Sequence, residues 1–256
     1  MFRVPLRFVF VFGVISFGLL SFEHASSSAQ DNAVKNGAPK SAAAKDVGMK
    51  EVFVDKFSGK LAEGWGWYRE DAEGWKVDDQ GLQLRTLPGT IWSKTQFNQL
   101  ERLAPASPEG KAQAVEVTVT HSPQTEYEQA GLQVMIDDQN IATLCTELYK
   151  GKFSVVSGRR IEGKFSHGGD AAIEGTTGES KTAESKTVES KSVTLRITKK
   201  GPSVKLEWLS GNEWKTLNEY PYPAPGTLKV GIHAHGGRRG EERWARFQNF
   251  RILQEE

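Results

Sequence analysis

The chain has 256 residues, of which 33 are Lys or Arg and 32 are Asp or Glu, so its formal net charge is +1. A nucleic-acid-binding surface is marked by a clustered basic excess, and this balance argues against one. Hydrophobic residues make up 38% of the chain and 26 residues are Gly, which is ordinary for a globular protein and excludes a largely disordered one.

The first 29 residues have the features of a secretory signal peptide. Two arginines precede an apolar run over 8–20, and small residues follow up to Ala29. This order predicts cleavage after Ala29 and a secreted or periplasmic protein. The apolar run is shorter than the roughly 20 residues of a spanning helix, so we expect no membrane span after cleavage. Cleavage removes two arginines and one glutamate, which leaves a formal charge of zero.

Two further segments have a biased composition. Residues 30–50 are rich in Ala, Ser, Lys, Asn and Gly, and so few apolar residues predict a disordered tether. Residues 162–191 end in the pentads ESKTA, ESKTV and ESKS, whose period of five matches neither a helix nor a strand. We therefore expect a low-complexity loop inserted at about 162–191, between two strands.

Most of the remaining chain alternates apolar and polar residues, which is typical of half-buried strands. Short turn signals such as DDQN, YKGK and SGN separate the alternating segments. Strands at this spacing, without a long helical pattern, predict one antiparallel β-sandwich over 51–254. The expected strands are 52–57, 82–86, 91–94, 115–119, 130–136, 141–148, 153–157, 193–197, 204–208, 214–217, 228–234 and 243–252.

The chain contains one cysteine, Cys145, in the apolar stretch IATLCTELY. One cysteine excludes an intramolecular disulfide even in an oxidising compartment. A catalytic thiol requires a cationic, partly exposed setting, which this stretch does not offer. We expect Cys145 to be a small buried residue on a strand.

Three stretches of the chain resemble a known family when taken in order. They are FVDKFSGKLAEGWGWYREDAEGWKVDDQGLQLRT (53–86), EYEQAGLQVMIDDQNIATLCTELYKGKFSVVS (126–157), and VTLRITKKGPSVKLEWLSGNEWKTL (193–217) followed by VGIHAHGG and RFQNFRIL. Together they resemble the concanavalin A-like domain at the C-terminus of β-xylosidases. The resemblance implies an all-β fold, an antiparallel jelly-roll β-sandwich of the lectin and glucanase type.

In β-xylosidases this domain packs against a catalytic propeller and contributes no catalytic acid or base. The resemblance therefore implies a carbohydrate-associated module, with a separate glycoside hydrolase chain as a possible partner. Glucanases of this fold place carboxylates at alternate positions on one strand, and the sequence has no such run. We accordingly assign no catalytic residue, and the fold alone does not decide the chemistry.

Aromatic residues near the start of the domain are the first candidate site. Sugar recognition needs flat apolar faces and a few polar groups that fix hydroxyls. Trp65 and Trp67 would share one face of a strand. With Tyr68, Glu70 and the later Trp92 they form a candidate carbohydrate-binding set. The alternative is that these rings fill the core of the sandwich.

The stretch GIHAHGGRRGEERW is the second candidate site. His233 and His235 are two residues apart on an expected strand and therefore point to the same face, and Arg238 follows on a glycine-rich turn. Two imidazoles on one face suit a hydroxyl-rich ligand. A metal site wants a third or fourth ligand, which the sequence does not identify, and an ordinary solvated sheet face is the alternative.

The two ends of the domain offer a candidate calcium site. Asp55 lies on the first expected strand and Asn249 on the last, and lectin-like sandwiches often bind calcium where their terminal strands pair. Backbone carbonyls would complete the coordination shell.

These observations favour a secreted, non-catalytic module that binds a neutral poly- or oligosaccharide on an aromatic-lined concave face. The first alternative is a glycoside-processing enzyme of the same fold. The second is an envelope protein-interaction module whose aromatic residues all lie in the core.

Overall fold

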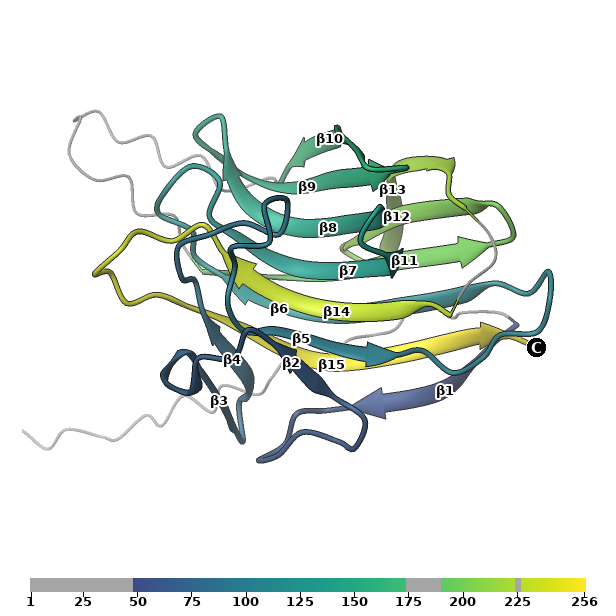
Figure 1. Cartoon of the computed structure of the whole chain (residues 1–256), viewed down its shortest axis with the longest axis horizontal. Helices are drawn as coiled ribbons and strands as arrows, with labels where there is room; N and C mark the ends of the chain where they lie inside the picture. The colour runs from purple at the N-terminus through teal and green to yellow at the C-terminus, as the bar shows by residue number, and fades with distance from the viewer. Residues whose placement is uncertain (1–47, 174–189, 224–226) are drawn as a thin grey trace, which may run out of the picture. The chain divides into compact units, whose positions relative to one another are not determined.

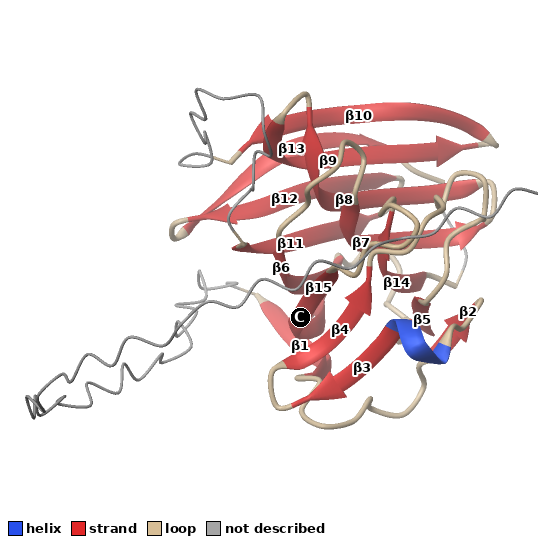
Figure 2. Cartoon of the chain, turned by 90° about the vertical axis from the view of Figure 1, so that its left-hand side faces the viewer, coloured by secondary structure: helices blue, strands red, loops and turns tan. Residues whose placement is uncertain are grey.

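Strands dominate the computed structural model of the chain, which describes residues 48–173, 190–223 and 227–256. Its 15 described strands form two sheets in which every neighbouring pair of strands is antiparallel (Figure 1). One short 3-10 helix, η1 (Ala72–Gly74), precedes β3, as Figure 2 shows. This confirms the predicted all-β sandwich, and it agrees with the long alternating segments of the sequence.

The eight-stranded sheet has the order β13-β12-β11-β6-β15-β4-β3, with β1 paired to β15. Its strands are β1 (Met49–Asp55), β3 (Trp75–Asp78), β4 (Gly81–Arg85), β6 (Gln113–His121), β11 (Lys191–Lys200), β12 (Ser203–Ser210), β13 (Glu213–Pro221) and β15 (Trp244–Glu255).

The seven-stranded sheet has the order β10-β9-β8-β7-β14-β5-β2. Its strands are β2 (Gly66–Tyr68), β5 (Gln99–Leu103), β7 (Gln129–Asp137), β8 (Asn140–Tyr149), β9 (Lys152–Ile161), β10 (Lys164–Ala172) and β14 (Lys229–His235).

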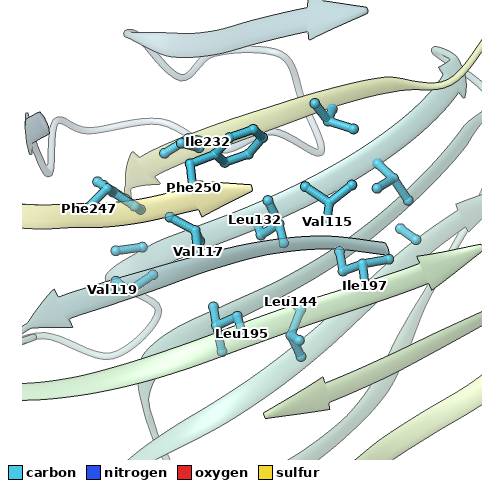
Figure 3. Packing of buried hydrophobic residues seen from close by; sticks show 14 of the residues in the cluster. Val115, Val117, Val119, Leu132, Leu144, Leu195, Ile197, Ile232, Phe247 and Phe250 are labelled. Atoms are coloured by element: carbon cyan, nitrogen blue, oxygen red, sulfur yellow. The ribbon is translucent and has the colours of Figure 1, made fainter. Parts of the chain in front are cut away.

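The core lies between the two sheets and consists of the apolar residues of each alternating strand. β6, β11 and β15 supply one side and β7, β8 and β14 the other, and Figure 3 shows their side chains meeting. Burying each Val, Leu, Ile or Phe side chain contributes about 1.5–3 kcal/mol. Fully buried examples from both sides are Val115, Val117, Val119, Leu195, Ile197, Phe247 and Phe250, and Leu132, Leu144 and Ile232.

The structure differs from the sequence-based expectation at several strands. Residues 91–94 form a turn and not a strand. The short strands β2, β3 and β5 are additional to the expected ones, whereas the equally short β4 was predicted. Residues 164–172 form strand β10 inside the expected insertion at 162–191, where it pairs with β9. Glycine and serine hid this strand, since its register is fixed by β9 rather than by its own apolar pattern.

The described strands all belong to one structural unit. The predicted signal peptide, residues 30–47 of the tether and the pentad repeats up to residue 189 lie outside the described residues. The last repeat, ESKS, ends inside β11, which begins at Lys191. The tether was expected to extend to residue 50, whereas β1 begins at Met49. Among the described residues no helix is long and apolar enough to cross a membrane.

A buried carboxylate ties together the loops at one end of the sandwich. Glu128 is 0% exposed. Its carboxylate accepts hydrogen bonds from the Thr86 hydroxyl at 2.7 Å, the Gln124 backbone N–H at 2.9 Å and Arg243 Nε at 2.9 Å. Burial acts to raise the pKa of Glu128, but the His121 imidazole and these hydrogen bonds outweigh burial and lower the pKa to about 2. Glu128 therefore remains ionised inside the protein.

The Glu128 network also holds the neighbouring Tyr127 in place. Tyr127 has a positive φ of 67°, which a bulky residue adopts only when its surroundings impose it. Gly236, at φ 82°, lies so close that a Cβ atom there would overlap the Tyr127 carbonyl. The conformations of these two loops are therefore coupled, and both loops border the pocket described next.

Candidate functional site

The candidate site is a pocket on the outer face of the seven-stranded sheet, the face turned away from the core. Along β7, Leu132 and Val134 are core residues, so Gln129 and Gly131, which alternate with them, belong to the outer face. The pocket has a volume of about 390 Å³. Residues of β8, β9, β10 and β14 complete its floor and part of its wall, and the segment before β5 that contains Trp92 also contributes to the wall.

Strand register places three polar residues of the floor in one row, which we call the polar row. His235 of β14 pairs with Gln129 of β7, and Gln129 pairs with Glu147 of β8. Gln129 Nε2 donates to Glu147 Oε2 at 2.5 Å. His235 and Glu147 are 2% and 1% exposed although they line the pocket, because the surrounding loops rise above them.

The imidazole of His235 has no partner for its polar atoms. Neither ring nitrogen makes a hydrogen bond within the described part of the chain. The same holds for both side-chain polar atoms of Gln133, two rows along the same face. Buried polar groups in folded proteins are nearly always hydrogen-bonded. Of these two residues His235 lines the pocket, so its ring nitrogens are available to a polar ligand.

The two histidines of β14 share the outer face, as their spacing predicts. Their rings stack with centroids 5.1 Å apart and an interplanar angle of 22°. Burial lowers the pKa of His235 to about 4. Burial, with the neighbouring His235, holds the pKa of His233 well below its usual range, although the backbone near Leu132 opposes this. Both rings are therefore neutral at pH 7. The alternative of a solvated sheet face is wrong, since both residues are buried.

The pKa of Glu147 is shifted upward, in contrast to the lowered pKa values of the two histidines. Burial raises its pKa to about 7, and the charges of Glu126 and Asp170 act in the same direction. The hydrogen bond from Gln129 works against these effects. Near neutral pH the carboxyl is consequently divided between its protonated and ionised forms, so small changes around it alter its charge.

Aromatic rings surround the mouth of the pocket, and we call them the aromatic rim. Trp92 and Phe165 are in contact on one side, with centroids 4.6 Å apart. On the other side, Tyr149 lies between Tyr127, at 6.3 Å, and His167, which stacks on it at 5.3 Å. Tyr127 is 63% exposed and Phe165 is 54% exposed. The rim therefore presents large apolar surfaces to solvent next to a polar floor.

Trp92 reaches the pocket because two local features place it there. The turn over 91–94 is fixed by hydrogen bonds such as Trp92 N–H to Thr90 Oγ1 at 3.3 Å, and Arg160 donates to the Trp92 carbonyl. Gly158 of β9 leaves room for the indole, because a Cβ atom at this position would lie 2.5 Å from Trp92 Cζ2. The indole thus rests directly on the sheet.

Two of the predicted sugar-stacking residues lie elsewhere. Trp65 packs against Phe250 of the core, with ring centroids 4.9 Å apart, and donates its indole N–H to Asp55 at 2.9 Å. Trp67 packs against Trp75 at 4.7 Å. Both rings also pack against the core cluster. For Trp65 and Trp67 the alternative, that these rings fill the core of the sandwich, is therefore the correct one.

The remaining predicted residues are divided between the pocket and other surfaces. Trp92 and His235 line the pocket, and His233 stacks on His235. Tyr68 is half-buried in β2 and pairs with Gln99 away from the pocket lining. Glu70 accepts from the indole N–H of Trp75 at 3.0 Å, and the exposed Arg238 lies 4.0 Å from Glu241. Glu70 and Arg238 are not brought to the pocket.

The two residues predicted to bind calcium lie on paired strands, but the oxygens of Asp55 are already used in hydrogen bonds. Asp55 pairs with Phe250, the neighbour of Asn249, so the terminal strands do meet as expected. However, both oxygens of Asp55 accept hydrogen bonds, from the backbone N–H of Phe57 at 2.7 Å, from that of Ala62 at 2.8 Å and from Trp65. Among the described residues no three His, Cys, Asp or Glu side chains gather to hold a metal ion. The donor set therefore does not fit calcium.

Several pocket residues were not singled out from the sequence. Glu147 and Tyr149 alternate with the core residues of the expected strand 141–148, so strand periodicity alone places them on the outer face with Cys145. Phe165 lies in the segment expected to be a loop. Cys145 is buried, as predicted, and its thiol donates to the Val156 carbonyl at 3.6 Å.

The sequence profile of the family described as the β-xylosidase C-terminal concanavalin A-like domain matches residues 54–252. No curated protein sequence matches the chain.

Solved structures resemble the fold at low sequence identity. A glycoside hydrolase family 43 protein, BlXynB from Bacillus licheniformis, is 18% identical with a TM-score of 0.63, covering 80% of this chain and 39% of that one. A xylan β-1,4-xylosidase from Bacillus halodurans C-125 is 16% identical with a TM-score of 0.59, covering 79% and 39%.

A functionally unknown protein from Saccharomyces cerevisiae is 19% identical with a TM-score of 0.57, and the alignment covers 74% of this chain and 95% of that one. This chain thus spans about two fifths of the two hydrolases but nearly all of the yeast protein. The family profile matches more than half of the chain, and the antiparallel sandwich is consistent with that match. The chain therefore belongs to the family of β-xylosidase C-terminal concanavalin A-like domains.

Proposed function

We propose that the protein is a secreted or periplasmic, non-catalytic module that binds a neutral poly- or oligosaccharide in the pocket of the seven-stranded sheet. The observation that carries the proposal is the position of the exposed aromatic residues. Two of the four exposed large hydrophobic residues in the described chain, Tyr127 and Phe165, stand at the rim of one pocket. Exposed apolar surface next to unsatisfied buried polar atoms is typical of a ligand site.

The two parts of the pocket suit the two faces of a sugar. The C–H face of a pyranose ring stacks on an aromatic surface such as Trp92 or Tyr149. Its hydroxyls both donate and accept hydrogen bonds, and so does the polar row. Between these two pKa values, of about 4 for His235 and about 7 for Glu147, the row is mainly uncharged because His235 is neutral and Glu147 is protonated. The volume of about 390 Å³ lies within the usual range of ligand pockets.

A separate glycoside hydrolase chain is the partner that we propose for this module. The solved family 43 proteins carry the fold as about two fifths of their chain. A binding module that acts beside a hydrolase would keep the enzyme near its polysaccharide. Secretion, which the N-terminal sequence predicts, would bring both proteins to the same substrate.

Retention on immobilised polysaccharides tests the proposal. Purified protein is passed over a broad set that includes xylan, arabinan, galactan, mannan and β-glucan. We expect retention on at least one, and Trp92→Ala or Tyr149→Ala should weaken it by roughly tenfold, the equivalent of about 1.4 kcal/mol. Trp244→Ala, which removes a half-buried indole from the eight-stranded sheet, is the matched control and should leave retention unchanged.

Two results would overturn the proposal. One is the absence of retention on every polysaccharide of the set by a folded protein. The other is retention that survives Trp92→Ala and Tyr149→Ala but falls with the control variant, because the ligand would then lie on the other sheet.

A glycoside-processing enzyme is the second candidate, and the carboxyl of Glu147 favours it. A pKa of about 7 in a pocket is suited to a general acid that works near neutral pH. Glycoside hydrolysis also needs a second carboxylate, and Glu147 is the single carboxylate among the described residues that line the pocket. Turnover of aryl glycosides that Glu147→Gln abolishes would establish the enzyme and displace the binding module.

A further inference from the structure

The charge of the pocket is one-sided. The described residues that line it include one carboxylate, Glu147, and no lysine or arginine. The lining also contains two imidazoles, His167 and His235, and burial keeps His235 neutral. The cations nearest to the described lining, Lys150 and Arg160, lie against the rim rings of Tyr149 and Trp92. The floor of the pocket therefore presents negative charge to a ligand.

Two more carboxylates strengthen this negative field. Glu126 and Asp170 lie close enough to Glu147 to act on its charge. Glu126 accepts hydrogen bonds from the backbone N–H groups of Lys150 and Gly151, at 3.0 and 2.6 Å, so neutral donors satisfy its oxygens. Asp170 lies 4.0 Å from the ammonium of Lys150, whose side chain is 73% exposed, and water screens such a pair.

Aromatic rings complete an environment that attracts cations. An ammonium group is drawn to the face of an aromatic ring, and cages of such rings bind ammonium ligands. The rim shows this attraction within the chain, because the ammonium of Lys150 lies 4.6 Å from the centroid of the Tyr149 ring. Trp92, Phe165 and Tyr127 surround the same opening.

We propose that the pocket discriminates among sugars by charge and that it prefers a protonated amino sugar, whose ammonium pairs with Glu147 between the rings of the rim. This inference rests on the proposed sugar-binding function and adds a substrate class to it. The unsatisfied ring nitrogens of His235 fix neighbouring hydroxyls. A uronic acid is rejected because its carboxylate would lie beside Glu147 and in the field of Glu126 and Asp170. A neutral sugar remains a weaker ligand of the same pocket.

Binding of an ammonium group changes the protonation of the pocket. The cation stabilises ionised Glu147 and lowers its pKa from about 7. The proton that Glu147 loses goes to solvent when the ligand arrives as an ammonium group, and it passes to the amine when the ligand arrives unprotonated. At pH 5 Glu147 is protonated in the free protein, and the preference for the amino sugar becomes smaller. The other titratable or charged groups around Glu147 are Glu126, Asp170, Lys150, Cys145, Tyr127, Tyr149, His167 and His235.

Isothermal titration of the full chain with three β-1,4-linked tetrasaccharides tests the inference. The tetrasaccharides of glucosamine, of glucose and of N-acetylglucosamine share one backbone and differ at carbon 2. At pH 7 we expect the glucosamine ligand to bind about tenfold more tightly than the other two, as a charge-assisted hydrogen bond allows. At pH 6, where more of the amine is already an ammonium group, titration in buffers of different ionisation enthalpy should show net proton release for the glucosamine ligand alone.

Variants of Glu147 and Asp170, with Glu213 as the control, test whether the preference for the amino sugar depends on Glu147. Glu147→Gln keeps the shape of the side chain and a carbonyl for Gln129, and it should reduce the tenfold preference to about one and abolish proton release. Glu213→Gln, an exposed carboxyl of the other sheet, should preserve both. Asp170→Asn should reduce the preference without abolishing it.

Equal affinity for the three ligands, or a preference that Glu147→Gln leaves intact, would overturn the inference while the proposed binding of neutral sugars stands. Failure of the folded protein to retain any sugar, charged or neutral, would overturn both.

Discussion

Glu128 offers the sharpest test of what holds the site together. We predict that Glu128→Gln destabilises the protein by about 3 kcal/mol at pH 7. Glutamine retains one acceptor oxygen, but its amide nitrogen would face the donors of Gln124 and Thr125. It also leaves Arg243 without its buried counter-charge. Removing one partner of a buried ion pair typically costs about 3–5 kcal/mol, and the partial exposure of Arg243 argues for the lower end.

The pKa of Glu128 gives the same magnitude independently. Its value of about 2, against the reference of 4.5, corresponds to about 3 kcal/mol at about 1.4 kcal/mol per pKa unit. Because the folded-state pKa is depressed, this stability is present above pH 4.5 and is lost as the pH falls towards 2. About half of it should remain at pH 3.

Urea unfolding monitored by tryptophan fluorescence measures both effects. At pH 7 the midpoint of Glu128→Gln should fall with an unchanged dependence on urea concentration, and the gap to the wild type should narrow by about half at pH 3. Glu213→Gln, as an exposed control, should stay within about 0.5 kcal/mol. A loss below about 1 kcal/mol, or a gap that does not change with pH, would refute the reasoning.

Three further predictions concern other parts of the fold. Trp65→Ala should cost about 3–5 kcal/mol in thermal or urea unfolding because the indole packs on Phe250, and a loss of sugar retention without a loss of stability would contradict its core position. Gly158→Ala should displace the Trp92 indole and weaken sugar retention in an affinity assay, whereas undiminished retention would show that the indole does not contact the ligand. Chelation with EDTA should leave the melting temperature unchanged because the oxygens of Asp55 are already hydrogen-bonded, and a fall of several degrees on chelation would reveal a structural cation.

The sequence was most informative where strands are long. An alternating strand such as 115–119 buries one side of its residues whatever its neighbours are, so the pattern identifies both the strand and its core face. Short elements gave no such signal. The apolar pair Ile91 and Trp92 suggested a strand, yet the backbone over 91–94 forms a turn. Strand β10 takes its register from β9 rather than from its own residues.

In the candidate site, too, the sequence predicted some features and the tertiary fold decided others. The spacing of His233 and His235 was enough to place them on one face, but their burial depends on loops that come from elsewhere in the chain. Likewise, Trp65 and Trp92 look alike in sequence. One belongs to the core and the other to the pocket because of the partners that the fold gives them, Phe250 and Gly158 respectively.

The amino-acid sequence by itself determined the all-β class, the family and the apolar face of each long strand, because these depend on local periodicity and on the order of motifs. Only the tertiary structure decided which aromatic residues are exposed and that Glu147, Gln129 and His235 form one row. Register between strands distant in sequence sets these neighbours. Burial under the loops then sets the charge of each group, and no single segment of the chain contains that information.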